Sequence, residues 1–81
     1  MTVKEAPLNT KLIVRSFSND ELRELSDVES RLMHLGFMDG ENIRITRRAP
    51  FSHGPLLIEV RGRSVALTPD EASLISVEVF R

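Results

Sequence analysis

The stretch Arg31–Pro50, RLMHLGFMDGENIRITRRAP, combines a helix end, a turn and a strand within one short run. Gly36 is expected just past the helix end, because glycine reaches the left-handed conformation without steric cost. Gly40 supplies a second residue suited to a positive φ angle, in the turn that follows. Along Asn42–Ala49, apolar and polar residues then alternate, which predicts a strand with one buried face.

Upstream of this stretch, the sequence predicts helix. Ser18–Glu21 and Ser26–Glu29 both match the capping box, in which a serine oxygen and a glutamate satisfy the first backbone N–H groups. An apolar stripe repeats at spacings of three and four residues. Its members are Leu22, Leu25, Val28, Leu32 and Leu35. We therefore expect one broken helix or two consecutive helices, with the stronger element from about Asp27 to Leu35.

The remaining elements are short strands and turns. Strands are expected at Lys11–Phe17, Leu56–Gly62, Ser64–Leu67 and Leu74–Phe80, with a helical turn that begins at Thr68. Structural turns are expected at Gly36, Gly40, Pro50, Gly54 and Gly62. This order predicts a mainly β fold, a small barrel of about five strands with a helical insertion after the first strand and a helical turn before the last.

The length and composition limit the class of protein. A chain of 81 residues is predicted to form a single domain over residues 1–81, with residues 1–6 disordered. The absence of cysteine excludes disulfides, thiolate metal sites and thiol nucleophiles. No apolar run approaches the roughly 20 residues that span a bilayer, and the N-terminus does not resemble a secretory signal. We expect a cytoplasmic protein without membrane insertion.

Catalytic and metal-binding residues are scarce. No serine lies in a nucleophile elbow, and the glycines do not match a phosphate-binding loop, so we expect neither an enzyme nor a bound cofactor. The two histidines, His34 and His53, are weak candidate metal ligands, because a protein site needs three or four convergent ligands. His34 at a helix end more often interacts with the C-terminal dipole. Weak Fe²⁺ or Zn²⁺ binding is left open.

Charge is unevenly distributed along the chain. The segment Asp20–Glu29 is acidic, whereas a later segment is rich in arginine, although the whole chain has a net charge of −1. The arginines are Arg44, Arg47, Arg48, Arg61 and Arg63. A small barrel with such a patch could bind nucleic acid, but no Tyr or Trp is present for base stacking. A solvated sheet face is the favoured interpretation, and nucleic-acid binding is kept as an alternative.

Large apolar side chains occur where the chain reverses direction. Leu35, Phe37, Met38 and Phe51 lie near the helix end, the following turn and the loop after the basic strand. Such residues often mark binding surfaces, so these four are the candidate protein-binding residues. The alternative for Phe37 is that it plugs the end of the barrel, because a chain of this size needs its large side chains for the core.

Taken together, RLMHLGFMDGENIRITRRAP and the later LLIEVRGRSVALTPDEASLISVEV resemble the FeoA family of small cytosolic partners of the ferrous iron transporter FeoB. The resemblance covers about Pro7–Val79. The residues that match the family pattern are Arg31, Leu32, Leu35, Gly36, Phe37, Gly40, Ile43, Ala49, Pro50, Gly62, Ala66, Leu67, Glu71, Ala72, Ile75 and Val77. Two features depart from the pattern: Asp39 stands where the family usually has proline, and the segment Ser18–Asp27 is longer and more acidic.

The resemblance implies an SH3-like barrel and a non-enzymatic accessory role in bacterial ferrous iron uptake. It names the cytosolic GTP-binding region of FeoB as the partner, through which the protein would associate with the inner membrane. Related domains also occur at the end of DtxR-type repressors, so a metal-sensing domain is a further alternative. Self-association is left open.

Overall fold

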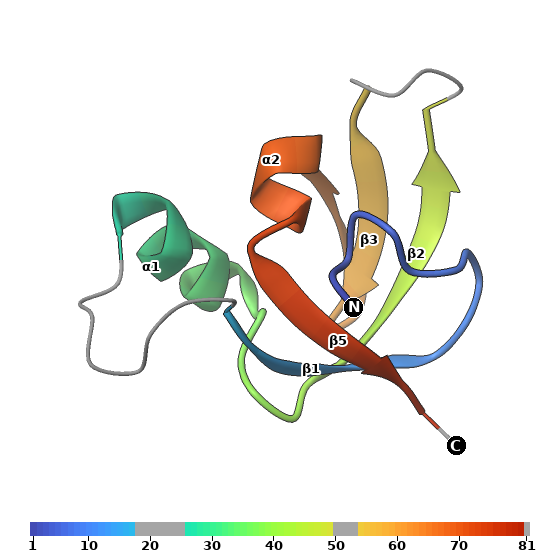
Figure 1. The fold of residues 1–81 in the computed structure, drawn as a ribbon, viewed down its shortest axis with the longest axis horizontal. Coiled ribbons are helices and arrows are strands. Elements are labelled where there is room, and N and C mark those ends of the chain that lie inside the picture. The colour runs from blue at the N-terminus through green and yellow to red at the C-terminus, as the bar shows by residue number, and fades with distance from the viewer. Residues whose placement is uncertain (18–25, 50–53, 81) are drawn as a thin grey trace.

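The computed structural model describes residues 1–17, 26–49 and 54–80 (Figure 1). The elements are β1 (Leu12–Phe17), α1 (Asp27–Leu35), β2 (Asn42–Arg48), β3 (Leu56–Val60), β4 (Arg63–Leu67), α2 (Pro69–Ala72) and β5 (Ile75–Val79). The mainly β arrangement and the two helical segments expected from the sequence are confirmed. The first predicted helix start, Ser18–Glu21, lies outside the described residues.

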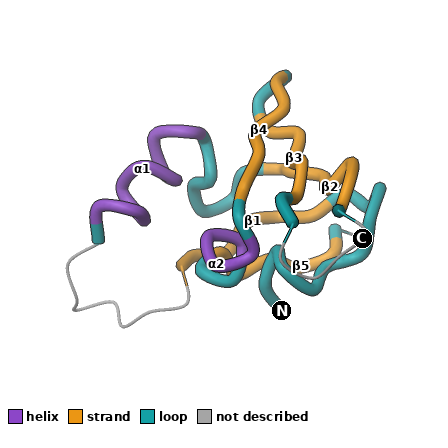
Figure 2. The backbone as a smooth tube through the Cα atoms, turned by 90° about the horizontal axis from the view of Figure 1, so that it is seen from above, coloured by secondary structure: helices purple, strands orange, loops and turns teal. Residues whose placement is uncertain are grey.

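The five strands of the described residues form one antiparallel sheet, in the order β4-β3-β2-β1-β5. The sheet curls around its core, and α2 connects the two edge strands (Figure 1). Helix α1 projects to one side of the strands in both views (Figures 1 and 2). Its C-terminal end, where the chain returns toward the sheet, is therefore a junction between two parts of the molecule.

The core is formed by the inward-facing residues of the strands together with single residues from the helices and the N-terminal segment. These residues are Val3, Ala6, Leu12, Val14, Leu32, Phe37, Ile43, Ile45, Leu56, Ile58, Val60, Leu67, Ala72, Ile75 and Val77. The alternation predicted for β2 and β3 places Ile43, Ile45 and Ile58 inside. With no disulfide available, this single apolar cluster stabilises the fold.

Residues 1–6, expected from the sequence to be disordered, are ordered in the structure and pack against the sheet. Val3 and Ala6 are fully buried in the core. The Val3 N–H donates to the Ile75 carbonyl at 3.0 Å, and the Val77 N–H donates to the Met1 carbonyl at 2.8 Å. The segment thus pairs with β5 and covers what would otherwise be an exposed strand edge, a recognised liability of small sheets.

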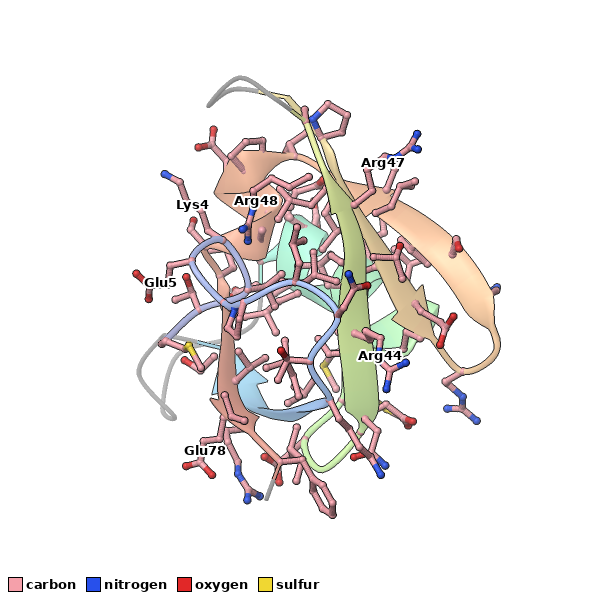
Figure 3. The ribbon with its side chains drawn as sticks, turned by 90° about the vertical axis from the view of Figure 1, so that its right-hand side faces the viewer. Lys4, Glu5, Arg44, Arg47, Arg48 and Glu78 are labelled. Atoms are coloured by element: carbon pink, nitrogen blue, oxygen red, sulfur yellow. The ribbon has the colours of Figure 1, made fainter. Side chains whose placement is uncertain are left out.

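A β-bulge in β2 changes the direction in which one arginine points. The pairing with β3 shifts between Ile45 and Arg47, so Arg48 falls opposite the buried Leu56 rather than on the outer face. Its guanidinium donates to the carbonyl oxygens of Lys4 at 3.1 Å and Ala6 at 2.9 Å. Figure 3 shows Arg48 on the side of β2 toward Lys4. Arg48 therefore fastens the N-terminal segment to the sheet.

Helix α1 begins with the capping box predicted at Ser26–Glu29, and α2 begins at Thr68 as predicted, also with a capping box. Ser26 and Glu29 exchange side-chain and backbone hydrogen bonds at the start of α1, and Thr68 and Glu71 do the same at α2. Glu71 also forms an ion pair with Arg31 of α1. The carboxylate of Glu71 consequently caps one helix and links it to the other, which explains why both of its oxygens are engaged.

Candidate protein-interaction surface

Gly36 ends α1 through two backbone hydrogen bonds. Gly36 adopts a left-handed conformation with φ of 115°. Its N–H donates to the Met33 carbonyl at 3.0 Å, and the Phe37 N–H donates to the Leu32 carbonyl at 3.1 Å. These two bonds define a Schellman motif, in which the residue after the glycine folds back toward the last turn of the helix.

The Schellman motif places Phe37 in the core. Its exposed fraction is 0%, the same as that of Leu32, and both belong to the central cluster. Of the two interpretations of Phe37 that the sequence left open, burial in the core is the one the structure has, because the motif brings Phe37 back toward Leu32 in the last turn of the helix. Leu32 and Phe37 are apolar residues four positions before and one position after the glycine that ends the helix. This spacing is the sequence signal that could have predicted the burial of Phe37.

Met38 follows Phe37 and points away from the core, with an exposed fraction of 40%. The backbone of this turn is held on both sides. The Gly40 N–H, at a residue with φ of 87°, donates to the Val14 carbonyl at 2.7 Å, and the Val14 N–H donates to the Glu41 carbonyl at 2.9 Å. A short Met38 N–H bond to the Gly36 carbonyl, 2.9 Å, tightens the turn further. Met38 is thus an exposed apolar side chain on a well-supported backbone.

A hollow of about 330 Å³ opens beside this turn on the outer side of α1. It is lined by Ser30, Met33, His34 and Met38, which we call the Met38 surface. Two thioether side chains give it an apolar, adaptable lining, since methionine is unbranched and accommodates partners of different shape. Of the other predicted binding residues, Leu35 is half-buried against the core.

On its other side, the end of α1 packs closely against the β3–β4 turn. A Cβ atom on Gly36 would lie 2.9 Å from Cδ of Arg61 and 3.1 Å from Cγ2 of Val60, so this close approach requires glycine. Arg63 donates to the Leu35 carbonyl at 3.3 Å. A cation at this place favourably meets the negative end of the helix dipole. The helix end is therefore fixed to the hairpin as well as to β1.

The arginines of the sequence-predicted basic patch do not form one continuous surface. Arg48 points inward to the N-terminal segment, and Arg63 is engaged at the helix end. Arg44 and Arg61 line a separate hollow. Arg47 lies on the outer side of β2, as Arg44 does (Figure 3). An extended phosphate backbone would need a longer track of free cations than this arrangement offers.

The described residues do not fit a His- and carboxylate-based metal centre. Within residues 1–17, 26–49 and 54–80, no group of three or more His, Cys, Asp or Glu side chains converges. His34 is exposed and lies among serine and methionine side chains in the Met38 surface. The other candidate ligand, His53, lies outside the described residues.

The remaining predicted turn residues are partly described. Gly62 has φ of 81° and follows Arg61, which itself has φ of 52°, so both residues of this tight hairpin turn are left-handed. Gly54 is buried before β3. Pro50 and Phe51 lie outside the described residues, so their predicted roles stay predictions. In the part of the chain that the structure covers, no helix has the length and apolar character needed to cross a bilayer.

Comparison with solved structures identifies close relatives of the whole fold. FeoA from Stenotrophomonas maltophilia, solved in complex with zinc and described as an SH3 domain protein, is 35% identical, with a TM-score of 0.79 over 96% of this chain and 89% of that one. An FeoA-like protein from Clostridium acetobutylicum is 28% identical, with a TM-score of 0.81 over 100% of this chain and 87% of that one.

A second group of similar structures consists of longer proteins. The repressor ScaR with bound Zn²⁺ is 26% identical, with a TM-score of 0.79 over 99% of this chain but only 37% of ScaR. The likeness to ScaR is therefore confined to one part of that repressor. No curated protein sequence matches the chain.

A family model described as the FeoA domain matches residues 1–79, which is nearly the full length of the chain. The match includes both helices, all five strands and the residues of the Met38 surface. The SH3-like fold expected from the sequence is confirmed by these relatives. The chain belongs to the FeoA family.

Proposed function

We propose that the protein is a non-enzymatic accessory component of bacterial ferrous iron uptake and that its Met38 surface binds the cytosolic GTP-binding region of the transporter FeoB. Membership of the FeoA family supports the accessory role. On this proposal the protein works in the cytoplasm and reaches the inner membrane through FeoB.

The observation that carries the proposal is an exposed apolar hollow on a fixed backbone. Met33 and Met38 line the hollow, and the turn beneath Met38 is held by hydrogen bonds to Gly36 and Val14. A surface that is already ordered loses little conformational entropy when a partner binds. Flexible thioethers on such a frame favour recognition of an apolar protein segment.

Of the four binding residues expected from the sequence, Met38 is the one that lines the Met38 surface in the described residues. Phe37 contributes from below by filling the core under the turn, so its effect on binding is indirect. Leu35 is half-buried against the core and does not line the Met38 surface. Phe51 remains a prediction. Metal sensing is not the preferred function, because the described residues include no converging ligand set.

Binding of the purified cytosolic domain of FeoB to Met38→Asp and to a matched control tests the proposal. Leu8→Asp is the control, because Leu8 is 42% exposed against 40% for Met38, precedes β1 and does not line the Met38 surface. Met38→Asp should raise the dissociation constant by about tenfold or more, which corresponds to about 1.4 kcal/mol. Leu8→Asp should bind as wild type. Equal binding by a folded Met38→Asp variant would overturn the proposed surface.

A further inference from the structure

A second hollow, of about 300 Å³, lies where the start of β1 meets β2 and the β3–β4 turn. It is lined by Lys11, Asn42, Ile43, Arg44, Glu59, Arg61 and Gly62, and it shares no residue with the Met38 surface. We call it the cationic hollow. Its lining consists mainly of charged and amide side chains, whereas that of the Met38 surface includes two methionines.

The charge of the cationic hollow is opposite in sign to that of the whole chain, which carries −1. Three cations, Lys11, Arg44 and Arg61, face a single carboxylate, that of Glu59. Glu59 lies directly across from Arg44 in the pairing of β2 with β3 and so offsets one of these charges. A net positive charge remains on this cluster of side chains, and clustered charges attract anions more strongly than scattered surface charges do.

The guanidinium groups of Arg44 and Arg61 are not bound to a carboxylate in the described part of the chain. Neither side chain makes a hydrogen bond or an ion pair there, although Glu59 lies across from Arg44 in the sheet. The Lys11 ammonium lies 4.2 Å from the centre of the Phe80 ring, a cation–π contact that positions the amine without neutralising it. The stem of Arg61 lies against the backbone at Gly36. The side-chain N–H groups of all three cations are therefore available to bind a ligand.

The ligand that fits this arrangement is a short acidic segment of protein. Arginine donors match carboxylates in a bidentate manner, and the hollow has the volume of a small ligand pocket. A nucleic acid strand fits less well, since Arg48 and Arg63 are already engaged by backbone carbonyls and do not extend the track. The Phe80 ring, which could otherwise stack on a base, is covered by the Lys11 ammonium.

We propose that the cationic hollow binds an acidic peptide segment through Arg44 and Arg61, with Lys11 as a third cation. This inference rests on the proposed function in one respect: FeoB would carry the acidic segment beside the apolar one that meets the Met38 surface. The contact of Arg61 with Gly36 joins the two binding areas across the end of α1. A partner could then engage both at once.

An NMR titration of the ¹⁵N-labelled protein with hexaglutamate tests the hollow without FeoB. Saturable shifts are expected at the amides of Asn42, Arg44 and Gly62, and they should weaken as salt is raised. Arg44→Gln should weaken binding by at least about fivefold, because it removes one cation from the site. Arg47→Gln on the same strand, outside the hollow, should bind as wild type. Equal affinity of the two variants, or no saturable shift, overturns the inference.

A single-stranded oligonucleotide and the cytosolic domain of FeoB complete the test. Tighter binding of the oligonucleotide than of hexaglutamate at the same amides would contradict the choice of an acidic peptide. FeoB that binds wild type and Arg44→Gln equally would overturn the inference and leave the proposed function intact. If hexaglutamate binds the hollow but FeoB does not bind the protein, the proposed function is overturned. The inference that the hollow binds acidic peptides then still stands.

Discussion

Replacing Phe37 by alanine separates a core role from a direct binding role for this residue. Phe37 is 0% exposed and packs with Leu32 in the central cluster. Truncation of a buried phenylalanine costs about 3–5 kcal/mol, from lost transfer energy and from the cavity left behind. A chain of 81 residues has a free energy of unfolding of only about 4–12 kcal/mol, so this loss is a large fraction of the total.

Thermal unfolding followed by circular dichroism measures the effect. A loss of about 4 kcal/mol should lower the Tm by about 16–32 °C, at about 4–8 °C for each kcal/mol in a domain of this size. Met38→Ala is the matched control, because Met38 follows Phe37 directly but is 40% exposed, and its Tm should fall by less than about 8 °C. A Phe37→Ala variant that melts within about 5 °C of wild type would refute the core assignment.

Three further substitutions test individual contacts. Gly36→Ala should destabilise the fold by about 1–3 kcal/mol in urea unfolding, since it forces a left-handed Cβ against Arg61; an unchanged midpoint would contradict the close approach. Arg48→Met removes the two hydrogen bonds to the carbonyls of Lys4 and Ala6 and should lower the free energy of unfolding by about 1–3 kcal/mol. Hydrogen exchange at the Val3 amide should become faster. Unaltered exchange at this amide would show that the guanidinium does not hold the N-terminal segment. A double-mutant cycle between Arg31 and Glu71 should give a coupling energy below about 1 kcal/mol, because the Arg31 side chain is 55% exposed, and a value above about 2 kcal/mol would be inconsistent with a solvent-screened pair.

The parts of the fold that sequence reasoning predicted are those set by local interactions. The capping boxes at Ser26 and Thr68 and the glycine at position 36 depend on residues within one helical turn, so their patterns can be read directly. The alternation in β2 likewise follows from neighbouring residues. Helix α1 consequently has the bounds that the sequence predicts.

The parts that sequence reasoning missed depend on contacts between distant segments. Arg48 was expected on the outer face, but a bulge in β2, where this strand pairs with β3, turns it toward residues 4–6. The burial of Val3 requires the edge of β5, far away along the chain. Nothing in the local pattern of either segment specifies such a pairing, because bulges and edge contacts are determined by the assembled sheet.

The candidate surface proposed from the structure lies at the turn that the sequence also indicated, but it has a different set of residues. The sequence pointed to the turn after α1, and Met38 is exposed there. The contributions of Met33 and Ser30 were not predicted, since they come from the outer face of a helix whose apolar stripe is elsewhere. That Ser30 and Met33 lie beside Met38 could be predicted only if the direction in which the chain turns after α1 were already known.

Chemical-shift mapping of the ¹⁵N-labelled protein with the unlabelled cytosolic domain of FeoB locates the surface that FeoB contacts. We expect the largest perturbations at Ser30, Met33, His34 and Met38, and none at the amide of Leu8. Perturbations centred on the N-terminal segment before β1, with the Met38 surface unchanged, would contradict this expectation.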